Sequence, residues 1–261
     1  MSAPTSTRPG LSVTDLCAGY GRLEVVKDAT LSVAPGQWVG IVGRNGVGKT
    51  TLLSAICGLR YGRSTGTVTL DDVIISRAPA SVATRAGLVL VPDGHRVFGS
   101  LTVLENLLVC RTRRVPTPVH RRELVDRCFS LFPVLRRFAG KQAGLLSGGE
   151  QQMLSISQAL MLRPRVLVLD EPSSALAPLV VADIYAALGE LRSGGIGLLV
   201  AEQDVRRSLE STDVCHVLNR GSIVLSGPSE QLRTDKRVSR IVLGTEAAFQ
   251  SSATATATAT P

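Results

Sequence analysis

Residues 43–51 read GRNGVGKTT and directly follow the apolar run WVGIV at residues 38–42. They match the pattern G-x-x-x-x-G-K-[ST], between a predicted strand and a predicted helix, which disfavours an accidental glycine-rich turn. Glycines let successive backbone N–H groups converge on phosphate oxygens, and the helix start adds its positive dipole end. The lysine supplies a cation for the β- and γ-phosphates, and the threonine a hydroxyl for Mg²⁺. The predicted phosphate-binding residues are Gly43, Asn45, Gly46, Gly48, Lys49, Thr50 and Thr51.

A second motif lies in RVLVLDEP, residues 165–172. Asp170 ends an apolar run and Glu171 follows it. One carboxylate can hold the water shell of Mg²⁺, and the other can orient and deprotonate an attacking water. An Asp-Glu pair after a strand is a weak signal alone, but together with the phosphate loop it predicts a nucleoside-triphosphate hydrolase.

The arrangement of apolar runs predicts an α/β fold. Towards the C-terminus, strands without a polar face alternate with helices, which is typical of a parallel sheet covered on both sides. Short apolar runs separated by turns indicate further strands between Leu11 and Val42, and Thr102 with Glu105 predicts a capping box. Strands are expected at 38–42, 67–70, 73–75, 166–169 and 196–201, a hairpin at 214–226, and helices at 119–131, 147–162 and 179–192.

Composition limits the class of protein. The 261 residues are 44% hydrophobic, which excludes disorder as the overall state. No uncharged apolar run reaches the roughly 18 to 20 residues of a membrane span, and residues 1–10 do not resemble a secretory signal, so a cytosolic protein is expected. The net charge of +8 is compatible with nucleic acid, anionic lipid or phosphate ligands; a solvated basic surface facing lipid headgroups or acidic partners is favoured.

The five cysteines are widely spaced, so we expect buried thiols in a reducing compartment rather than disulfides or zinc ligands.

A third motif is LLSGGEQQM at residues 145–153, and in combination with the first two it indicates a known family. Ser147 is a predicted helix N-cap with Glu150 as its capping-box partner, and two glycines leave the helix start open to an anion. Together with the other two motifs, this segment resembles the signature sequence of ABC-type ATPases. The resemblance to that family covers nearly the whole ordered chain. The resemblance implies a parallel-sheet core, an N-terminal antiparallel β subdomain and a helical signature subdomain at about 94–163. The ATPase domain would span 11–244, between a flexible N-terminus at 1–10 and a low-complexity tail at 245–261.

The same resemblance implies roles for the site residues. ATP and Mg²⁺ would be the cofactors, with Glu171 and Gln203 as catalytic residues. Tyr20 would stack on adenine; the alternative is a strand-end tyrosine at the surface. Mg²⁺ would be held by Thr50, Asp93 and Asp170. In a head-to-tail dimer, the ATP of the partner subunit would be contacted by Ser147, Gly148, Gly149 and Glu150.

Three segments resemble one subgroup, the second ATPase subunit of branched-chain amino-acid importers, whose relatives serve amides or urea. They are VPDGHRVFGSLTVLENL at 91–107, LSGGEQQMLSISQALMLRPRVLVLDEPSSALAP at 146–178 and LLVAEQDV at 198–205. That subgroup typically has Glu, Ala and Gln where most ABC ATPases have Gln, Asp and His. Ala177 and Gln203 fit this pattern; Asp93 is a shorter acidic variant, and His95 stands where the subgroup usually has Arg.

The subgroup implies a set of partners. The chain would energise separate transmembrane permease subunits on the inner face of the membrane, pair with a sister ATPase or with itself, and serve a solute-binding protein indirectly. Residues 93–107 would carry the nucleotide state to the permease, with Val97, Phe98 and Leu101 either as contacts or as ordinary core. One rival is an ABC-type ATPase acting on nucleic acid or the ribosome, supported only by the net charge; neither a fused second ATPase unit nor a coiled-coil insert is present. The other is a non-hydrolysing regulator, which Lys49 and Glu171 argue against.

Overall fold

The computed structural model describes residues 10–59, 64–71, 73–76, 78–110 and 117–243. The predicted tail at 245–261, and the predicted N-terminal segment apart from Gly10, lie outside these residues. The strands are β1 (Leu11–Tyr20), β2 (Leu23–Val33), β3 (Trp38–Val42), β4 (Ser64–Leu70), β5 (Val73–Ile74), β6 (Leu88–Val91), β7 (Val166–Asp170), β8 (Gly197–Glu202), β9 (Val214–Asn219) and β10 (Ser222–Pro228). The helices are α1 (Lys49–Ile56), α2 (Ala80–Ala86), α3 (Val103–Val109), α4 (Pro118–Leu131), α5 (Pro133–Arg137), the 3₁₀ turn η1 (Ala143–Leu145), α6 (Gly148–Leu160), α7 (Pro178–Ser193), α8 (Val205–Ser211), α9 (Ser229–Leu232) and α10 (Lys236–Leu243).

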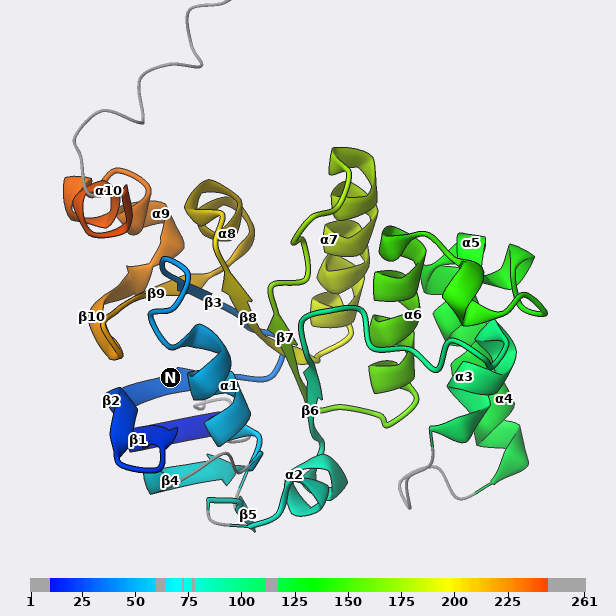
Figure 1. Cartoon of the computed structure of the whole chain (residues 1–261), viewed down its shortest axis with the longest axis horizontal. Helices are drawn as coiled ribbons and strands as arrows, with labels where there is room; N and C mark the ends of the chain where they lie inside the picture. The colour runs from blue at the N-terminus through cyan, green and yellow to red at the C-terminus, as the bar shows by residue number, and fades with distance from the viewer. Residues whose placement is uncertain (1–9, 60–63, 72, 77, 111–116, 244–261) are drawn as a thin grey trace, which may run out of the picture.

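Two sheets organise the chain (Figure 1). The larger has the strand order β10-β9-β3-β8-β7-β6, and all its neighbouring pairs are parallel except β10 with β9. The smaller is antiparallel, in the order β2-β1-β4-β5. Every residue of β3, β7 and β8 is buried, because both faces of these strands are covered by other elements. The predicted α/β fold with a parallel core and an antiparallel N-terminal sheet is confirmed.

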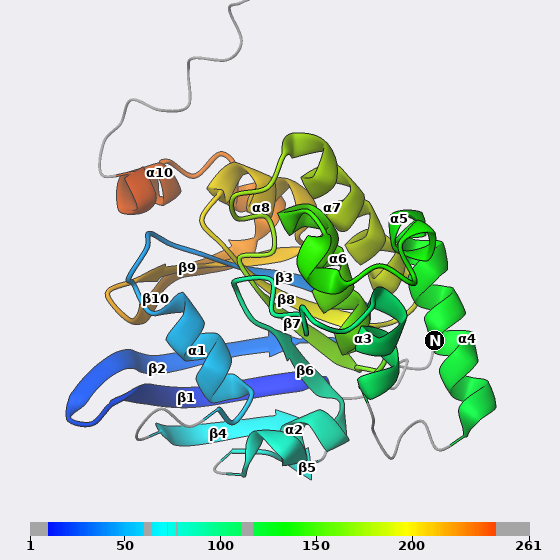
Figure 2. The ribbon, with the colours of Figure 1, turned by 45° about the vertical axis from the view of Figure 1, so that its right-hand side comes forward.

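Helices cover the two faces of the parallel sheet differently. Helix α1 contacts β1 and β2 on one side and β7 and β8 on the other, so it joins the two sheets. Helices α6 and α7 pack on the opposite face, and α3, α4 and α5 pack beyond α6 (Figure 2). The capping boxes predicted at Thr102 with Glu105 and at Ser147 with Glu150 both form at the starts of α3 and α6.

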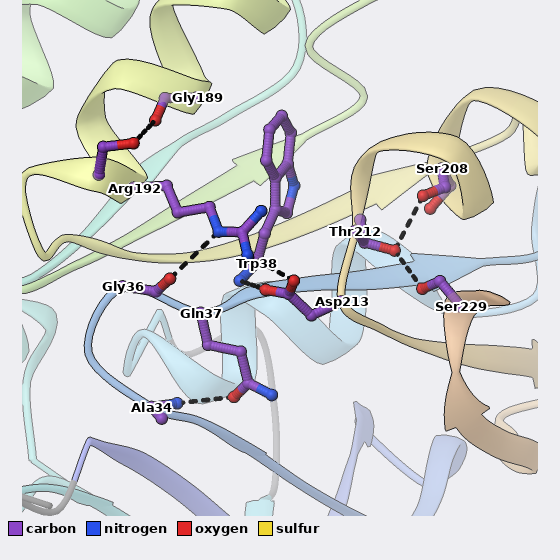
Figure 3. Close-up of polar contacts among 11 residues, drawn as sticks. Ala34, Gly36, Gln37, Trp38, Gly189, Arg192, Ser208, Thr212, Asp213 and Ser229 are labelled. Atoms are coloured by element: carbon purple, nitrogen blue, oxygen red, sulfur yellow. Dashed lines mark hydrogen bonds and ion pairs between the residues drawn. The ribbon is translucent and has the colours of Figure 1, made fainter.

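A polar network fixes the beginning of β3, the strand that leads into the phosphate loop (Figure 3). The carboxylate of Asp213 accepts hydrogen bonds from the Trp38 backbone N–H at 2.8 Å and from the Arg192 guanidinium. Arg192 also donates to the Gly36 carbonyl. Next to this network, the Thr212 hydroxyl donates to the Ser208 carbonyl and lies 2.7 Å from the Ser229 hydroxyl. The starts of β3 and β9, the end of α7 and the start of α9 are thereby connected.

The cysteine prediction is only partly correct. All five thiols are free, and Cys57, Cys128 and Cys215 are buried as expected. Cys17 and Cys110 are half-exposed. Cys17 follows an irregularity in β1 and donates its thiol proton to Asp28 at 3.2 Å, so it behaves as a polar strand-face residue. Within the described segments, no helix has the length and apolar character needed to cross a bilayer.

His216 on β9 makes the stability of this fold dependent on pH. It is 7% exposed and its Nδ1 lies 2.7 Å from the Ser226 hydroxyl. Burial lowers its pKa from 6.5 to about 4. Between these values the unfolded chain binds a proton that the folded chain does not, so this site costs stability as the pH falls. A shift of this size corresponds to about 3 kcal/mol.

We therefore expect the stability advantage of the wild type over His216→Asn to shrink by about 3 kcal/mol between pH 7.5 and pH 4. Urea unfolding at a series of pH values measures it. His120→Gln, at an exposed histidine, is the control and should show no such pH-dependent difference. A constant difference between wild type and His216→Asn would contradict the prediction.

Candidate active site

The phosphate loop runs from the end of β3 to the start of α1. Gly46 and Gly48 have φ of 78° and 109°, a region that side-chain-bearing residues rarely adopt. Gly43 is required for a different reason, because a Cβ there would lie 2.5 Å from the Leu218 carbonyl oxygen on β9. Backbone conformation and close packing thus both explain the glycines of GRNGVGKTT.

Lys49 is buried in this loop, with 4% of its surface exposed. Its Nζ donates to the carbonyls of Gly43 at 2.9 Å and Arg44 at 3.3 Å, and pairs with Glu171 Oε1 at 3.0 Å. A buried ammonium requires such partners, because isolated burial of a charge is very costly. The residue predicted to bind phosphate and the residue predicted to activate water are therefore in direct contact.

Glu171 stands at a strained turn. Its φ is +45°, and its backbone N–H donates to the Ala201 carbonyl at the end of β8 at 2.9 Å. Left-handed backbone at a residue with a side chain costs of order 1 kcal/mol or more and is enriched at functional sites. Here the turn directs the Glu171 carboxylate to Lys49 rather than onward along the strand.

Asp170, one residue earlier, carries the feature expected of a metal-binding carboxylate. It is 3% exposed, and its Oδ1 has no hydrogen-bond partner among the described residues. Burial raises its pKa; the Thr50 hydrogen bond and the Lys49 charge oppose this, while the charges of Glu171 and Asp93 add to it. An oxygen without a partner, with a hydroxyl and a second carboxylate nearby, suits a hard cation such as Mg²⁺. The described part of the chain contains no cluster of three or more His, Cys, Asp or Glu side chains placed to hold a metal.

The other predicted contact residues lie around the loop. The Tyr20 hydroxyl is 3.3 Å from the Thr51 hydroxyl in the first turn of α1, and the residue as a whole is 43% exposed. Gln203 is exposed directly after β8, and Asp93 is exposed two residues after β6. Parallel neighbours β3, β8, β7 and β6 bring the phosphate loop, Gln203, Glu171 and Asp93 to the same edge of the sheet.

The signature segment forms the start of α6. Glu150 accepts the Ser147 backbone N–H at 2.8 Å, while Ser147 and Gly148 remain exposed. Gly149 is buried, and a Cβ at this position would lie only 2.5 Å from the Val180 side chain on α7. Gly149 therefore allows α6 and α7 to pack closely, a role that the anion-site interpretation alone does not predict.

The comparison with known proteins decides the family. The ABC transporter family model matches residues 26–174, more than half of the chain. This chain belongs to the ABC transporter family. It is 36% identical to the high-affinity branched-chain amino acid transport ATP-binding protein BraG of Pseudomonas aeruginosa, over 90% of this chain and 99% of that protein. It is 33% identical to the lipopolysaccharide export system ATP-binding protein LptB of Haemophilus influenzae, over 90% and 97%. The crystal structure of a nucleotide-free ATP-binding cassette from an ABC transporter superposes with a TM-score of 0.77 at 26% identity, covering 89% of this chain and 98% of that one.

The chain is thus an ATP-binding subunit of an ABC transporter, an ATPase whose hydrolysis is coupled to transport. The matched region includes the phosphate loop at residues 43–51, in agreement with the nucleotide binding of this family. The recognition of the ABC family from the motifs, and the resemblance to branched-chain transport subunits, are confirmed. The two relatives have different cargoes, so family membership alone does not choose between import and export.

Sequence reasoning missed a group of polar residues next to this site. Glu202, the last residue of β8, is buried and hydrogen-bonded to Tyr185 and Ser173. Arg207, read from the sequence as part of a solvated basic surface, donates to Ser173 at 2.8 Å. The one available signal was an acidic residue at the end of an otherwise apolar strand. In the signature region, His95 Nδ1 lies 2.8 Å from the buried side-chain oxygen of Gln152 on α6, a contact that no motif indicated.

Lys49→Ala tests the loop chemistry. It removes the cation and leaves the carboxylate of Glu171 without its partner. A charge-assisted contact of this kind contributes about 1.5 to 3 kcal/mol, so the Kd for ATP should rise at least tenfold. Isothermal titration calorimetry with Mg-ATP measures this. Lys27→Ala removes an exposed lysine on β2 and is the matched control; equal affinities for both variants would contradict the assignment.

Proposed function

We propose that the chain hydrolyses ATP with Glu171 as general base. Lys49 would bind the β- and γ-phosphates, Tyr20 would stack on adenine, and Gln203 would donate a hydrogen bond to the γ-phosphate. Glu171 would accept a proton from the water that attacks the γ-phosphorus, and the bond to the ADP oxygen would break. The contact of 3.0 Å between Lys49 and Glu171 carries this proposal.

The metal-binding assignment follows from the same corner of the sheet. The Thr50 hydroxyl, Asp170 and Asp93 would hold Mg²⁺, which would neutralise phosphate charge. The Oδ1 of Asp170, which has no hydrogen-bond partner within the described segments, supports this assignment. The remaining loop residues, Asn45, Gly46 and Thr51, would contribute backbone N–H groups and a hydroxyl to the phosphates.

We infer that each ATP lies between two ATPase subunits arranged head to tail. Ser147 and Gly148 are exposed at the start of α6, where backbone N–H groups and the helix dipole favour an anion. With Gly149 and Glu150, they would contact the γ-phosphate of the ATP bound by the second subunit. That subunit would be a sister ATPase or a second copy of this chain.

We propose that the transporter imports branched-chain amino acids. Gln203 and Ala177 agree with the subgroup pattern, and the similarity to BraG extends over nearly that whole protein. Permease subunits would bind on the inner side of the membrane, and a solute-binding protein would deliver the cargo; no nucleic-acid partner is expected. Phe98 is 55% exposed, and Leu104 and Leu108 on α3 are 37% and 38% exposed, which supports a permease contact there. Lipopolysaccharide export is the second candidate, favoured by the similarity to LptB.

Leucine uptake separates the two candidates. When the gene for this chain is deleted in the source organism, the cells should lose most of their high-affinity uptake of radiolabelled leucine, isoleucine and valine. The wild-type chain and Lys27→Ala should restore uptake, whereas Lys49→Ala should not.

The tagged chain should also co-purify with amino-acid permease subunits from the membrane. Unchanged uptake in the deleted cells, together with co-purification of lipopolysaccharide-export subunits, would contradict import and favour export.

A further inference from the structure

A buried polar cluster lies directly behind Gln203. The carboxylate of Glu202 accepts the Tyr185 hydroxyl at 2.8 Å and the Ser173 hydroxyl at 3.0 Å. Arg207 donates to Ser173 and its guanidinium carbon lies 5.8 Å from the centre of the Tyr185 ring. Glu202 is 2% exposed, so both of its side-chain oxygens depend on these donors.

This cluster joins three parts of the chain that end at the ATP site. Glu202 is the last residue of β8, next to Gln203. Ser173 lies in the turn that carries Glu171, and Tyr185 lies in the middle of α7. The Ser173 hydroxyl both donates to Glu202 and accepts from Arg207. Removing the donor hydroxyl of Tyr185 or Ser173 would therefore leave a buried oxygen of Glu202 without its hydrogen bond.

The charges in the cluster also reach the proposed catalytic base. Burial raises the pKa of Glu202; its hydrogen bonds from Tyr185 and Ser173 and the Arg207 charge oppose this, and the charge of Glu171 adds to it. Burial likewise raises the pKa of Tyr185, with the nearby carboxylate of Glu202 acting in the same direction. Tyr185 is therefore a hydrogen-bond donor to Glu202 throughout the physiological pH range.

Helix α7 extends this connection to the signature segment. Val180 lies five residues before Tyr185, roughly 7.5 Å along the helix. It packs so closely on Gly149 that even one methyl group there would clash. Helix α7 thus contacts the end of β8 through Tyr185 and Glu202, and the start of α6 through Val180 and Gly149.

We propose that Glu202 is a positioning residue for ATP hydrolysis, and that its hydrogen bond from Tyr185 fixes Gln203 and the Glu171 turn to α7. Through Val180 and Gly149, the same helix sets where the signature segment stands. The groups that touch ATP in this chain and the segment offered to the partner subunit thus share one rigid element. The inference rests on the proposed catalytic roles of Glu171 and Gln203.

Tyr185→Phe is the sharpest test, because it removes one hydroxyl and keeps the ring, whose centre lies 5.6 Å from that of Trp38. Phosphate release is measured on the full chain, in the assembly with which it purifies. We expect kcat to fall about tenfold while KM and the Kd for Mg-ATP change less than twofold. Glu202→Gln should reproduce this split, because an amide has only one acceptor oxygen for the two donors. Ser193→Ala, which removes a hydroxyl at the far end of α7, is the control and should keep wild-type kinetics.

The positioning role is overturned if both variants keep wild-type kcat, or if kcat and ATP affinity fall in equal proportion. Glu171→Gln in the same assay separates this outcome from a failure of the proposed function. Retained hydrolysis in Glu171→Gln overturns the proposed base and the inference with it. An inactive Glu171→Gln beside a fully active Tyr185→Phe and Glu202→Gln overturns the inference alone.

Discussion

The burial of the Lys49 ammonium is the constraint on which the site depends. A cation with 4% exposure at the start of α1 has to be neutralised where it lies. Two carbonyls of the phosphate loop and the Glu171 carboxylate do this, which fixes the curvature of the loop and the strained turn after β7. A bound triphosphate offers the same ammonium stronger acceptors. In the proposed mechanism, Glu171 would then turn from its ion pair to a water molecule, which would link phosphate binding and activation of the base through one side chain.

The local parts of this design could be predicted from the sequence because each depends on residues close together in the chain. The phosphate loop, the Asp170–Glu171 pair and the Ser147–Glu150 capping box all have fixed spacings. The Glu202 cluster could not be predicted in this way, because Tyr185, Ser173 and Arg207 meet only after α7 and α8 pack on the sheet. Gly149 is similar, since its need for a small residue comes from Val180 on another helix.

Gln203 and Ala177 distinguish this chain from most ABC ATPases more than its fold does. An amide at position 203 keeps the same charge at every physiological pH, whereas histidine changes its charge near neutrality. Turnover would then depend less on this contact as the pH varies. The relatives BraG and LptB, named for different cargoes, are both similar to this chain over most of its length, so we expect cargo to be determined by the permease, for which Phe98 and α3 are the proposed contact, and not by the ATP site.

The central claim is that ATP hydrolysis takes place between two subunits, and the dimerisation of Glu171→Gln tests it most directly. This variant keeps the size of the side chain and removes its basicity, so unhydrolysed ATP should hold it in a dimer, either with itself or with its sister ATPase. Adding Ser147→Arg places a bulky side chain at the contact with the partner's ATP and should abolish the dimer while leaving ATP binding to the monomer intact. Light scattering with ATP, with ADP and without nucleotide measures this. A Glu171→Gln chain that stays monomeric in saturating ATP with the sister subunit present, or a double variant that dimerises as well as its parent, would contradict the account.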